Sequence, residues 1–208
     1  MTQPDRLVPL LDHLLRLKTT RRTGWLDRGV PAPETESVAD HVLLATLTGW
    51  LTADPSLDRD RLIKLLLVHD LAEVITGDPP PYDRADVPSR DEEALRAFFS
   101  RRHVRTAESK AAKDAREARA MAVLRELMPD DAGDEIVALW QEYESQETPE
   151  ARFAKDIDRF EAFVQARAYA RQHPGLPLSG FTKMAQEELE SPQLIALRDA
   201  ILAREDEA

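Results

Sequence analysis

The stretch LIKLLLVHDLAEVITGDPPP, residues 62–81, decides how this sequence is interpreted. It begins as a nearly continuous apolar helix and then places His69 and Asp70 side by side, with Glu73 one turn later. Burying ionisable groups costs free energy unless they are paired or bind a metal ion. We therefore expect this helix to carry ligands of a metal.

The spacing of these groups indicates which of them can act together. On a helix, His69 and Asp70 are about 100° apart around the axis, close enough for both to approach one point. Glu73 follows His69 by four residues and Asp70 by three, so it shares their face. Asp78 comes directly after the glycine that ends the helix. Taken alone, the string is equally well explained as a helix with one solvated face.

A second histidine and a distant aspartate complete a possible ligand set. His41 lies in the first turns of a predicted helix within ESVADHV, and Asp158 lies within AKDIDRFEAF. Together with His69 and Asp70, they provide two imidazoles and two carboxylates. Mixed nitrogen and oxygen ligands suit one divalent transition metal ion (Mn, Co, Fe, Ni or Zn) better than Ca or Mg.

Both added residues also have simpler explanations. His41 on its own is better explained as a hydrogen-bonded core histidine, and it becomes a candidate ligand only beside the 69–70 pair. Asp158 competes with Asp156, which lies two residues away and so points to nearly the opposite side of a helix. Only one of them can serve, and Asp156 is simply explained as an acid in a first helical turn, where the helix dipole favours negative charge.

Composition excludes several classes of protein. The seven glycines form neither GxGxxG nor GxxxxGK[ST], so a glycine-rich phosphate loop is not expected. A net charge of −11 disfavours binding to polymeric nucleic acid. The absence of cysteine excludes disulfides and thiolate catalysis.

No apolar run approaches the ~20 residues that span a bilayer, and the N-terminus lacks the core of a signal peptide. We therefore expect a cytoplasmic protein that does not associate with a membrane.

Apolar residues recur at helical spacing along almost the whole chain, which predicts an all-α fold in a single domain, residues 1–208. Ser37 is a predicted helix N-cap, with Asp40 as its capping-box partner. Gly77 and the prolines after it are expected to end the helix that begins near Asp58. The expected helices cover roughly residues 7–17, 37–51, 58–76, one or two segments of 90–128, 133–146, 149–172, 181–190 and 192–204.

Five blocks along the chain resemble one enzyme family. They are RTGW at 22–25, ESVADH at 36–41, LVHDLAEVITGD at 67–78, LWQEYE at 139–144 and AKDIDRFE at 154–161. On an all-helical chain, these blocks resemble the HD-domain metal-dependent phosphohydrolases, and in particular their 5′-deoxynucleotidase branch. The similarity covers about residues 7–170 and implies an HD-domain helical bundle, with a C-terminal helical extension at about 180–204.

The resemblance implies roles for particular residues. The implied metal ligands are His41, His69, Asp70 and Asp158. The implied catalytic or substrate-orienting acids are Glu73 and Asp78. The implied contacts to the nucleotide are Arg22 and Trp25.

Several of these roles have alternatives in the sequence. Glu73 could instead hold a ligand imidazole, and Asp78 could be only a turn residue. Arg22 lies in a basic loop, although arginine suits phosphate because it binds in a bidentate manner. Trp25 either fills the core or stacks on a base or sugar.

Three further residues near these blocks are harder to assign. Lys155, one turn before Asp158, either reaches a substrate phosphate or pairs with Asp158. Trp140 and Tyr143 are three residues apart and are expected to pack in the interior.

The implied reaction is hydrolysis of deoxyribonucleoside 5′-monophosphates to deoxynucleosides and phosphate, by a homodimer acting on a small-molecule nucleotide. One alternative is an HD-type hydrolase of a nucleoside di- or triphosphate or an alarmone, for which the chain offers few evident basic residues. A second is a non-catalytic helical interaction protein that retains a metal site. Residues 83–100 are extra length compared with the compact members of this branch, and they could cover the site. No chemistry is expected from residues 90–128.

Overall fold

The computed structural model describes residues 3–88 and 91–206, and these residues form helices with no strand among them. Their one extended pairing is an isolated bridge between Arg21 and Ser37. The predicted all-α fold is therefore confirmed. Among these described residues, no helix combines the length and the apolar character needed to cross a bilayer.

The helices follow the predicted segments closely, with one exception described below. Their bounds are α1 (Gln3–Leu15), α2 (Thr23–Leu26), α3 (Val38–Thr52), α4 (Arg59–Val68), α5 (Glu73–Thr76), α6 (Glu92–Phe99), α7 (Ala107–Leu127), α8 (Asp130–Ser145), α9 (Pro149–Gln172), α10 (Ser179–Glu188) and α11 (Pro192–Asp206). Short 3-10 helices lie at η1 (Arg16–Lys18) and η2 (Arg84–Asp86).

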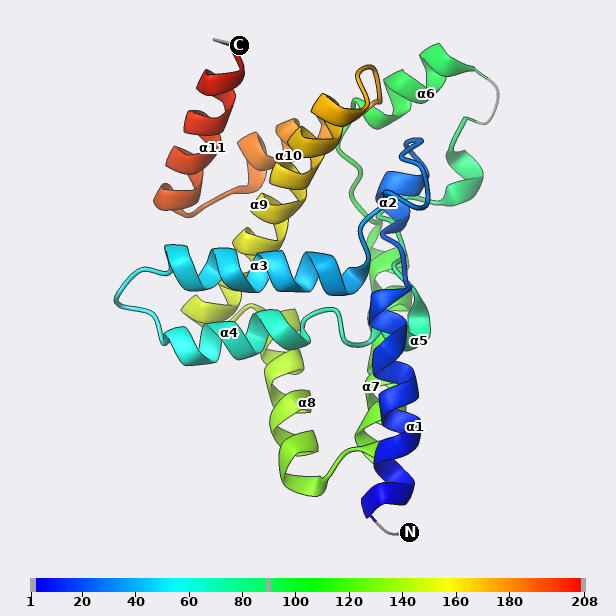
Figure 1. The fold of residues 1–208 in the computed structure, drawn as a ribbon, viewed down its shortest axis with the longest axis vertical. Coiled ribbons are helices and arrows are strands. Elements are labelled where there is room, and N and C mark those ends of the chain that lie inside the picture. The colour runs from blue at the N-terminus through cyan, green and yellow to red at the C-terminus, as the bar shows by residue number, and fades with distance from the viewer. Residues whose placement is uncertain (1–2, 89–90, 207–208) are drawn as a thin grey trace.

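Helix α9 forms the centre of the fold. It contacts α3, α4, α8, α10 and α11, and Phe153, Ile157, Phe160 and Phe163 are among its buried side chains. Helices α3 and α4 form an antiparallel pair that crosses α8 and α9, while α1 runs beside α7 (Figure 1). The apolar interior thus surrounds a central helix that also carries the polar residues Asp156, Asp158 and Glu161.

The predicted continuous helix over 58–76 is wrong. Helix α4 ends at Val68, and the backbone then forms tighter turns, in which Leu71 donates to the Val68 carbonyl and Glu73 to the Asp70 carbonyl. Helix α5 begins only at Glu73 and ends at Thr76, and it is followed by Gly77, whose φ of 71° favours glycine. Glu73 therefore shares no helix with His69, and the turn decides how the two side chains meet.

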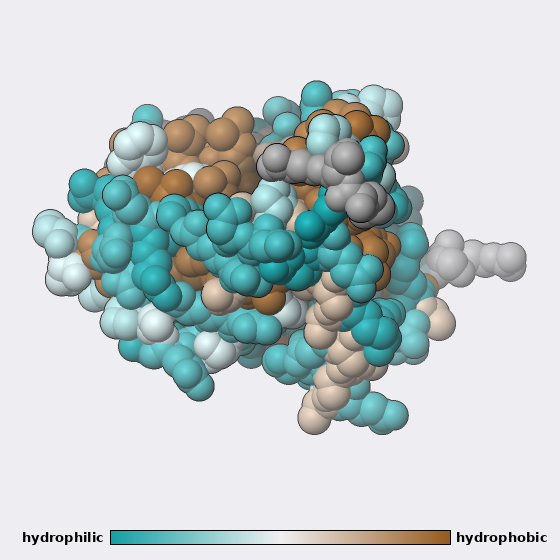
Figure 2. All heavy atoms as spheres, turned by 90° about the horizontal axis from the view of Figure 1, so that it is seen from below, coloured by the Kyte–Doolittle hydropathy of each residue, from teal (hydrophilic) through white to brown (hydrophobic). Residues whose placement is uncertain are grey.

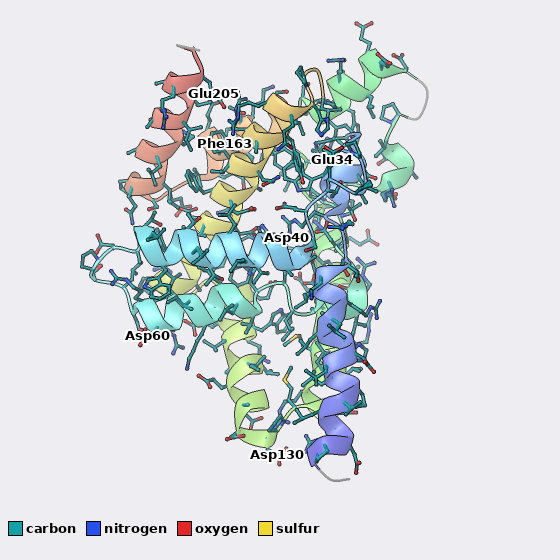
Figure 3. All side chains as sticks on the ribbon, viewed as in Figure 1. Glu34, Asp40, Asp60, Asp130, Phe163 and Glu205 are labelled. Atoms are coloured by element: carbon teal, nitrogen blue, oxygen red, sulfur yellow. The ribbon has the colours of Figure 1, made fainter. Side chains whose placement is uncertain are left out.

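The capping box at the start of α3 is confirmed. The backbone N–H of Asp40 donates to Ser37 Oγ over 3.2 Å, and the Ser37 N–H donates to Asp40 Oδ2 over 2.8 Å. Asp40 and Asp60 mark opposite ends of the α3–α4 pair (Figure 3). His41 follows Asp40, and His69 follows the last residue of α4, so both histidines lie at the same end of this pair.

Residues 83–100, apart from 89–90, which lie outside the described residues, pack against the end of the molecule that holds α2 and α10. The buried guanidinium of Arg28 lies between two aromatic rings, with its carbon 4.2 Å from the centre of Phe99 and 4.6 Å from that of Phe181. Such contacts stabilise a desolvated cation. Arg28 also donates to the Gly24 carbonyl over 2.8 Å. One arginine therefore joins α2, α6 and α10.

Gly180 provides a test of how closely α10 must approach this segment. A Cβ on Gly180 would lie 2.5 Å from the Phe99 carbonyl oxygen and 3.1 Å from that of Arg101. We expect Gly180→Ala to lower the free energy of unfolding by about 1–3 kcal/mol, because backbone atoms cannot move aside easily. The measurement is urea unfolding followed by circular dichroism.

The matched control is Gly24→Ala in α2. A Cβ there would meet Arg28 Nη1 at 3.6 Å, an ordinary contact. This variant should keep the stability of the parent or gain slightly, since alanine favours helix. Equal losses of stability in the two variants would contradict the close approach at Gly180.

Candidate metal centre and active site

The structure brings the four predicted ligands together from three parts of the chain. His41 comes from α3, His69 and Asp70 from the turn after α4, and Asp158 from the middle of α9. The Nε2 atoms of the two histidines lie 3.2 Å apart. The Nε2 atom of His41 lies 3.3 Å from Asp158 Oδ1, and that of His69 lies 3.3 Å from Asp70 Oδ2. Two imidazoles and two carboxylates therefore surround one small space.

Contacts on the far side of each ring fix the two imidazoles. The Nδ1–H of His69 donates to the Leu66 carbonyl over 2.7 Å, which leaves the Nε2 lone pair facing the other ligands. His41 Nδ1 lies 2.5 Å from Glu161 Oε2, and the Glu161 side chain is buried. Histidines that ligate metals commonly bond a carboxylate or a backbone carbonyl through the other ring nitrogen. Both rings are thus oriented as ligands require.

The electrostatics of this group favour a cation. Burial alone would lower the pKa of His41, but Glu161 and Asp158 outweigh burial and raise it to about 10. Burial would raise the pKa of Asp70, yet His69, Arg22 and His41 hold it well below its usual range. His41 Nε2, His69 Nε2 and an Asp158 oxygen all lie within 4.8 Å of one another. Buried carboxylates with two inward imidazole nitrogens fit a divalent ion chemically.

The two aspartates of α9 have separate roles in the structure. Asp158 faces the histidines, whereas Asp156 Oδ2 accepts hydrogen bonds from the backbone N–H groups of Glu190 and Ser191, over 2.9 and 2.8 Å. The prediction that Asp156 is a first-turn acid is wrong, because α9 begins seven residues earlier, at Pro149. Asp156 instead supports the beginning of α11.

Arg22 and the two predicted acids lie beside the ligand group. Arg22 Nη1 is 3.2 Å from Asp70 Oδ2 and 3.7 Å from Asp78 Oδ1. Asp78 also accepts a hydrogen bond from the backbone N–H of Thr23. Asp78 is therefore held against the start of α2 and is more than a turn residue.

Glu73 is buried next to these charges. Its Oε2 atom has no hydrogen-bond partner among the described residues. Burial, together with the charges of Asp70 and Asp78, raises the pKa of Glu73 well above its usual value. The structure brings Glu73 to the ligand group, although not on the helix that the sequence predicted.

Trp25 is buried, with 2% of its surface exposed. Its indole N–H donates to Glu36 Oε1 over 2.7 Å, and its ring packs against Phe181 and edge-on against Tyr169. It also borders the cavity described below. The burial favours the alternative in which Trp25 fills the interior, and a contact with substrate stays a prediction.

Lys155 and Tyr143 form a small network with Asp158. Lys155 Nζ lies 2.7 Å from Asp158 Oδ2, and the Tyr143 hydroxyl donates to the same oxygen over 3.0 Å. The pairing of Lys155 with Asp158 is thus present, while its contact with phosphate stays a prediction. Tyr143 packs in the interior as expected, against His69, but its hydroxyl adds a polar role that the spacing did not predict.

A cavity of about 470 Å³ opens beside this group. Arg22, Asp70, Glu73, Asp78, Lys155 and Asp158 line it. Arg105 and Lys113, from a stretch to which the sequence assigned no chemistry, also line it. Lys113 Nζ lies 2.5 Å from the buried carboxylate of Glu117, four residues later on α7. Basic groups that the sequence did not reveal therefore face the site.

The sequence analysis did not predict that Glu161 and Glu117 are buried polar residues. Glu161 had a detectable signal, because it follows Asp158 by three residues and so shares its helical face. Glu117 lies in a helix so rich in charge that its burial could not be distinguished from an exposed ion pair.

Comparison with known proteins places the chain in a family. The model of the HD domain matches residues 14–195. The chain belongs to the HD domain family. Within this family, the 5′-deoxynucleotidase hdd1 of Schizosaccharomyces pombe is 39% identical over 181 residues, covering 85% of this chain and 79% of that protein.

A second relative and a solved structure agree with this membership. The human 5′-deoxynucleotidase HDDC2 is 33% identical over 192 residues, covering 92% of this chain and 82% of that protein. The structure of a predicted metal-dependent phosphohydrolase from Magnetospirillum magnetotacticum superposes with a TM-score of 0.62 at 25% identity, covering 97% of this chain and 92% of that one.

The two aspartates of α9 should separate metal binding from stability. We expect Asp158→Ala to reduce bound divalent metal at least about tenfold, since a ligand is lost. We expect Asp156→Ala to keep the metal but to lower the free energy of unfolding by about 1–3 kcal/mol, because two backbone donors lose their partner.

Metal content after dialysis, measured by plasma mass spectrometry, and thermal unfolding test this pair. Each variant serves as the control for the other. Loss of metal in Asp156→Ala with retention in Asp158→Ala would reverse the assignment.

Proposed function

We propose that this HD-domain protein is a metal-dependent 5′-deoxynucleotidase, which converts deoxyribonucleoside 5′-monophosphates to deoxynucleosides and phosphate. The observation that carries the proposal is the convergence of His41, His69 and Asp158, with Asp70 beside both histidines, next to a cavity that Arg22 also lines. The names of hdd1 and HDDC2 support the same activity.

The cofactor that we propose is one divalent transition metal ion held by these four side chains. The donor set fits Mn, Co, Ni, Fe or Zn and does not select among them. When bound, such an ion lowers the pKa of a coordinated water and polarises a phosphate oxygen.

Cationic side chains would bind the phosphate group. Arg22 contacts Asp70 and Asp78 through Nη1, which leaves its other guanidinium nitrogens for phosphate oxygens. Lys155 faces the cavity with 30% of its side chain exposed. Fixed positive charge near the oxygens stabilises the charge that develops during phosphoryl transfer.

The two buried acids would handle the proton and the sugar. Glu73 has an unpartnered oxygen, and its pKa is raised well above the usual value, so it is suited to hold or relay a proton beside the ligand group. Both histidines are directed at the ligand group and are not available for this task. Asp78 is fixed by Thr23 and Arg22 and would contact the sugar.

We also propose a cytoplasmic homodimer that acts on small-molecule nucleotides and binds neither polymeric nucleic acid nor membranes. The net charge of −11 is consistent with the absence of nucleic-acid binding.

One observation favours a second candidate function. Arg105, Lys110 and Lys113 add positive charge to the cavity wall beyond Arg22 and Lys155. Such charge would also suit a nucleoside di- or triphosphate. The two candidates differ in their products, because a monophosphate yields a nucleoside and phosphate, whereas a di- or triphosphate yields either a shorter nucleotide or a nucleoside with released di- or triphosphate.

The test is a product screen on metal-stripped protein. Mn²⁺, Co²⁺, Ni²⁺ or Zn²⁺ is added in turn to deoxy- and ribonucleoside mono-, di- and triphosphates. We expect phosphate release from deoxyribonucleoside monophosphates with at least one ion, and at least about a 10³-fold loss in Asp70→Ala. Equal release by Asp70→Ala would refute the metal-dependent mechanism. Metal binding without turnover of any substrate would instead indicate a non-catalytic helical interaction protein that retains a metal site.

Two lysines on α7 test whether the wall of the cavity contributes to substrate binding. Lys113 and Lys110 both line the cavity and both pair with an acid four residues later, but the Lys110 side chain is 62% exposed and that of Lys113 is 23% exposed. We expect Lys113→Met to lower kcat/KM by about 10–100-fold, since a partly desolvated charge is lost. Lys110→Met should change it less than about twofold. Equal effects in steady-state kinetics would show that burial of the lysine is irrelevant.

A further inference from the structure

An apolar surface covers the exposed side of α3 and continues onto Leu67 of α4. Its members are the exposed side chains Leu43, Leu44, Leu47, Trp50 and Leu51 of α3 and Leu67 of α4, with exposed fractions from 39% to 85%. We call these six residues the α3–α4 face. Figure 2 shows apolar residues gathered on the side of the molecule where α3 and α4 lie at the front in Figure 1.

This face differs from the rest of the surface in its charge. From Val42 to Thr52 the chain has no charged residue, although 32% of all residues are charged. A helix with only one buried side normally carries polar residues on the other. Here His41, Ala45 and Gly49 are on the buried side, while leucines and a tryptophan are on the exposed side. Helix α3 is therefore apolar on both sides.

The size of the face matches a protein interface. With on the order of 200 Å² for a fully exposed large side chain, the six residues expose roughly 600 Å². That is at the upper limit for a patch on a monomer and approaches the ~800 Å² that each partner buries in a standard interface. Leu43, Leu47, Trp50 and Leu51 follow helical spacing, so they form one ridge that can pack against another helix.

We propose that the α3–α4 face is the surface through which two copies of this chain associate, a proposal that rests on the homodimer suggested above. A two-fold interface uses the same patch on both copies, and an apolar ridge is complementary to itself. The absence of charge on the exposed side of α3 matters because each copy carries −11, and contact through an uncharged helix side adds no local repulsion between the copies.

A lipid membrane fits the α3–α4 face less well than a second copy of the chain does. Helices that lie on membranes place lysine and arginine beside the apolar side, where they meet anionic lipid. Here aspartates flank α3 at both ends, Asp40 at its start and Asp54 just after it. Such acids would be repelled by an anionic surface.

Association through this face would restrict the helices that carry the proposed metal ligands. The buried side of α3 carries His41, and α4 leads directly into His69 and Asp70. Fixing the outside of this helix pair would therefore restrict the elements that position three of the four proposed ligands.

The test compares two substitutions of leucines with equal exposure. Leu47 is 43% exposed on α3, and Leu197 is 40% exposed on α11, outside the α3–α4 face. Sedimentation velocity over micromolar concentrations should show a dimer for the parent and for Leu197→Glu. Leu47→Glu should weaken self-association at least about tenfold, because it places a carboxylate in each half of a desolvated contact. Circular dichroism should show unchanged helix content in both variants.

Three results would overturn the proposal, and none depends on enzyme activity. A monomeric parent would refute both the homodimer and the face. A parent dimer with Leu47→Glu equally dimeric would refute the face alone. A monomeric parent that sediments with phosphatidylcholine vesicles would assign the face to lipid instead.

Discussion

The Nε2 atoms of His41 and His69 lie 3.2 Å apart, with carboxylate oxygens of Asp70 and Asp158 close by. Neither ring can easily turn away, because the Leu66 carbonyl and the Glu161 carboxylate hold the opposite nitrogens. Buried donors and acceptors so arranged need a cation among them. Glu161 and Asp158 accordingly raise the pKa of His41 to about 10, so positive charge is favoured at this ring.

This constraint explains why the surrounding fold takes its form. The Ser37 capping box fixes where α3 begins and therefore the turn on which His41 lies. Helix α4 must stop at Val68 so that the chain can turn and direct His69 and Asp70 inward. Helix α9 must be buried along most of its length so that Asp158 faces the histidines while Asp156 faces α11. Substrate chemistry can then use the groups that surround this centre, with Arg22 and Lys155 for the phosphate and Glu73 for the proton.

The sequence predicted much of this because the signals were local. Capping residues, helical periodicity and the glycine before Asp78 each act within one or two turns of the chain, and the corresponding helices are present. The break after Val68 was not predicted, since LVHDLAEVIT has no proline or glycine and its propensity is helical throughout. Tertiary contacts of His69 and Asp70 override that propensity. Tyr143 and Lys113 reach the site only through packing between helices, which spacing within one helix cannot reveal, whereas Glu161 shares the helical face of Asp158 on α9 and could have been detected.

Anomalous diffraction from crystals grown with Mn²⁺ or Co²⁺ tests the central claim most directly. A metal shared by the four side chains predicts one strong anomalous peak between the two Nε2 atoms and the oxygens of Asp70 and Asp158, at about 2.0–2.3 Å from its ligands. No peak at this position, or a peak held by other residues with both imidazoles turned away, would contradict the claim.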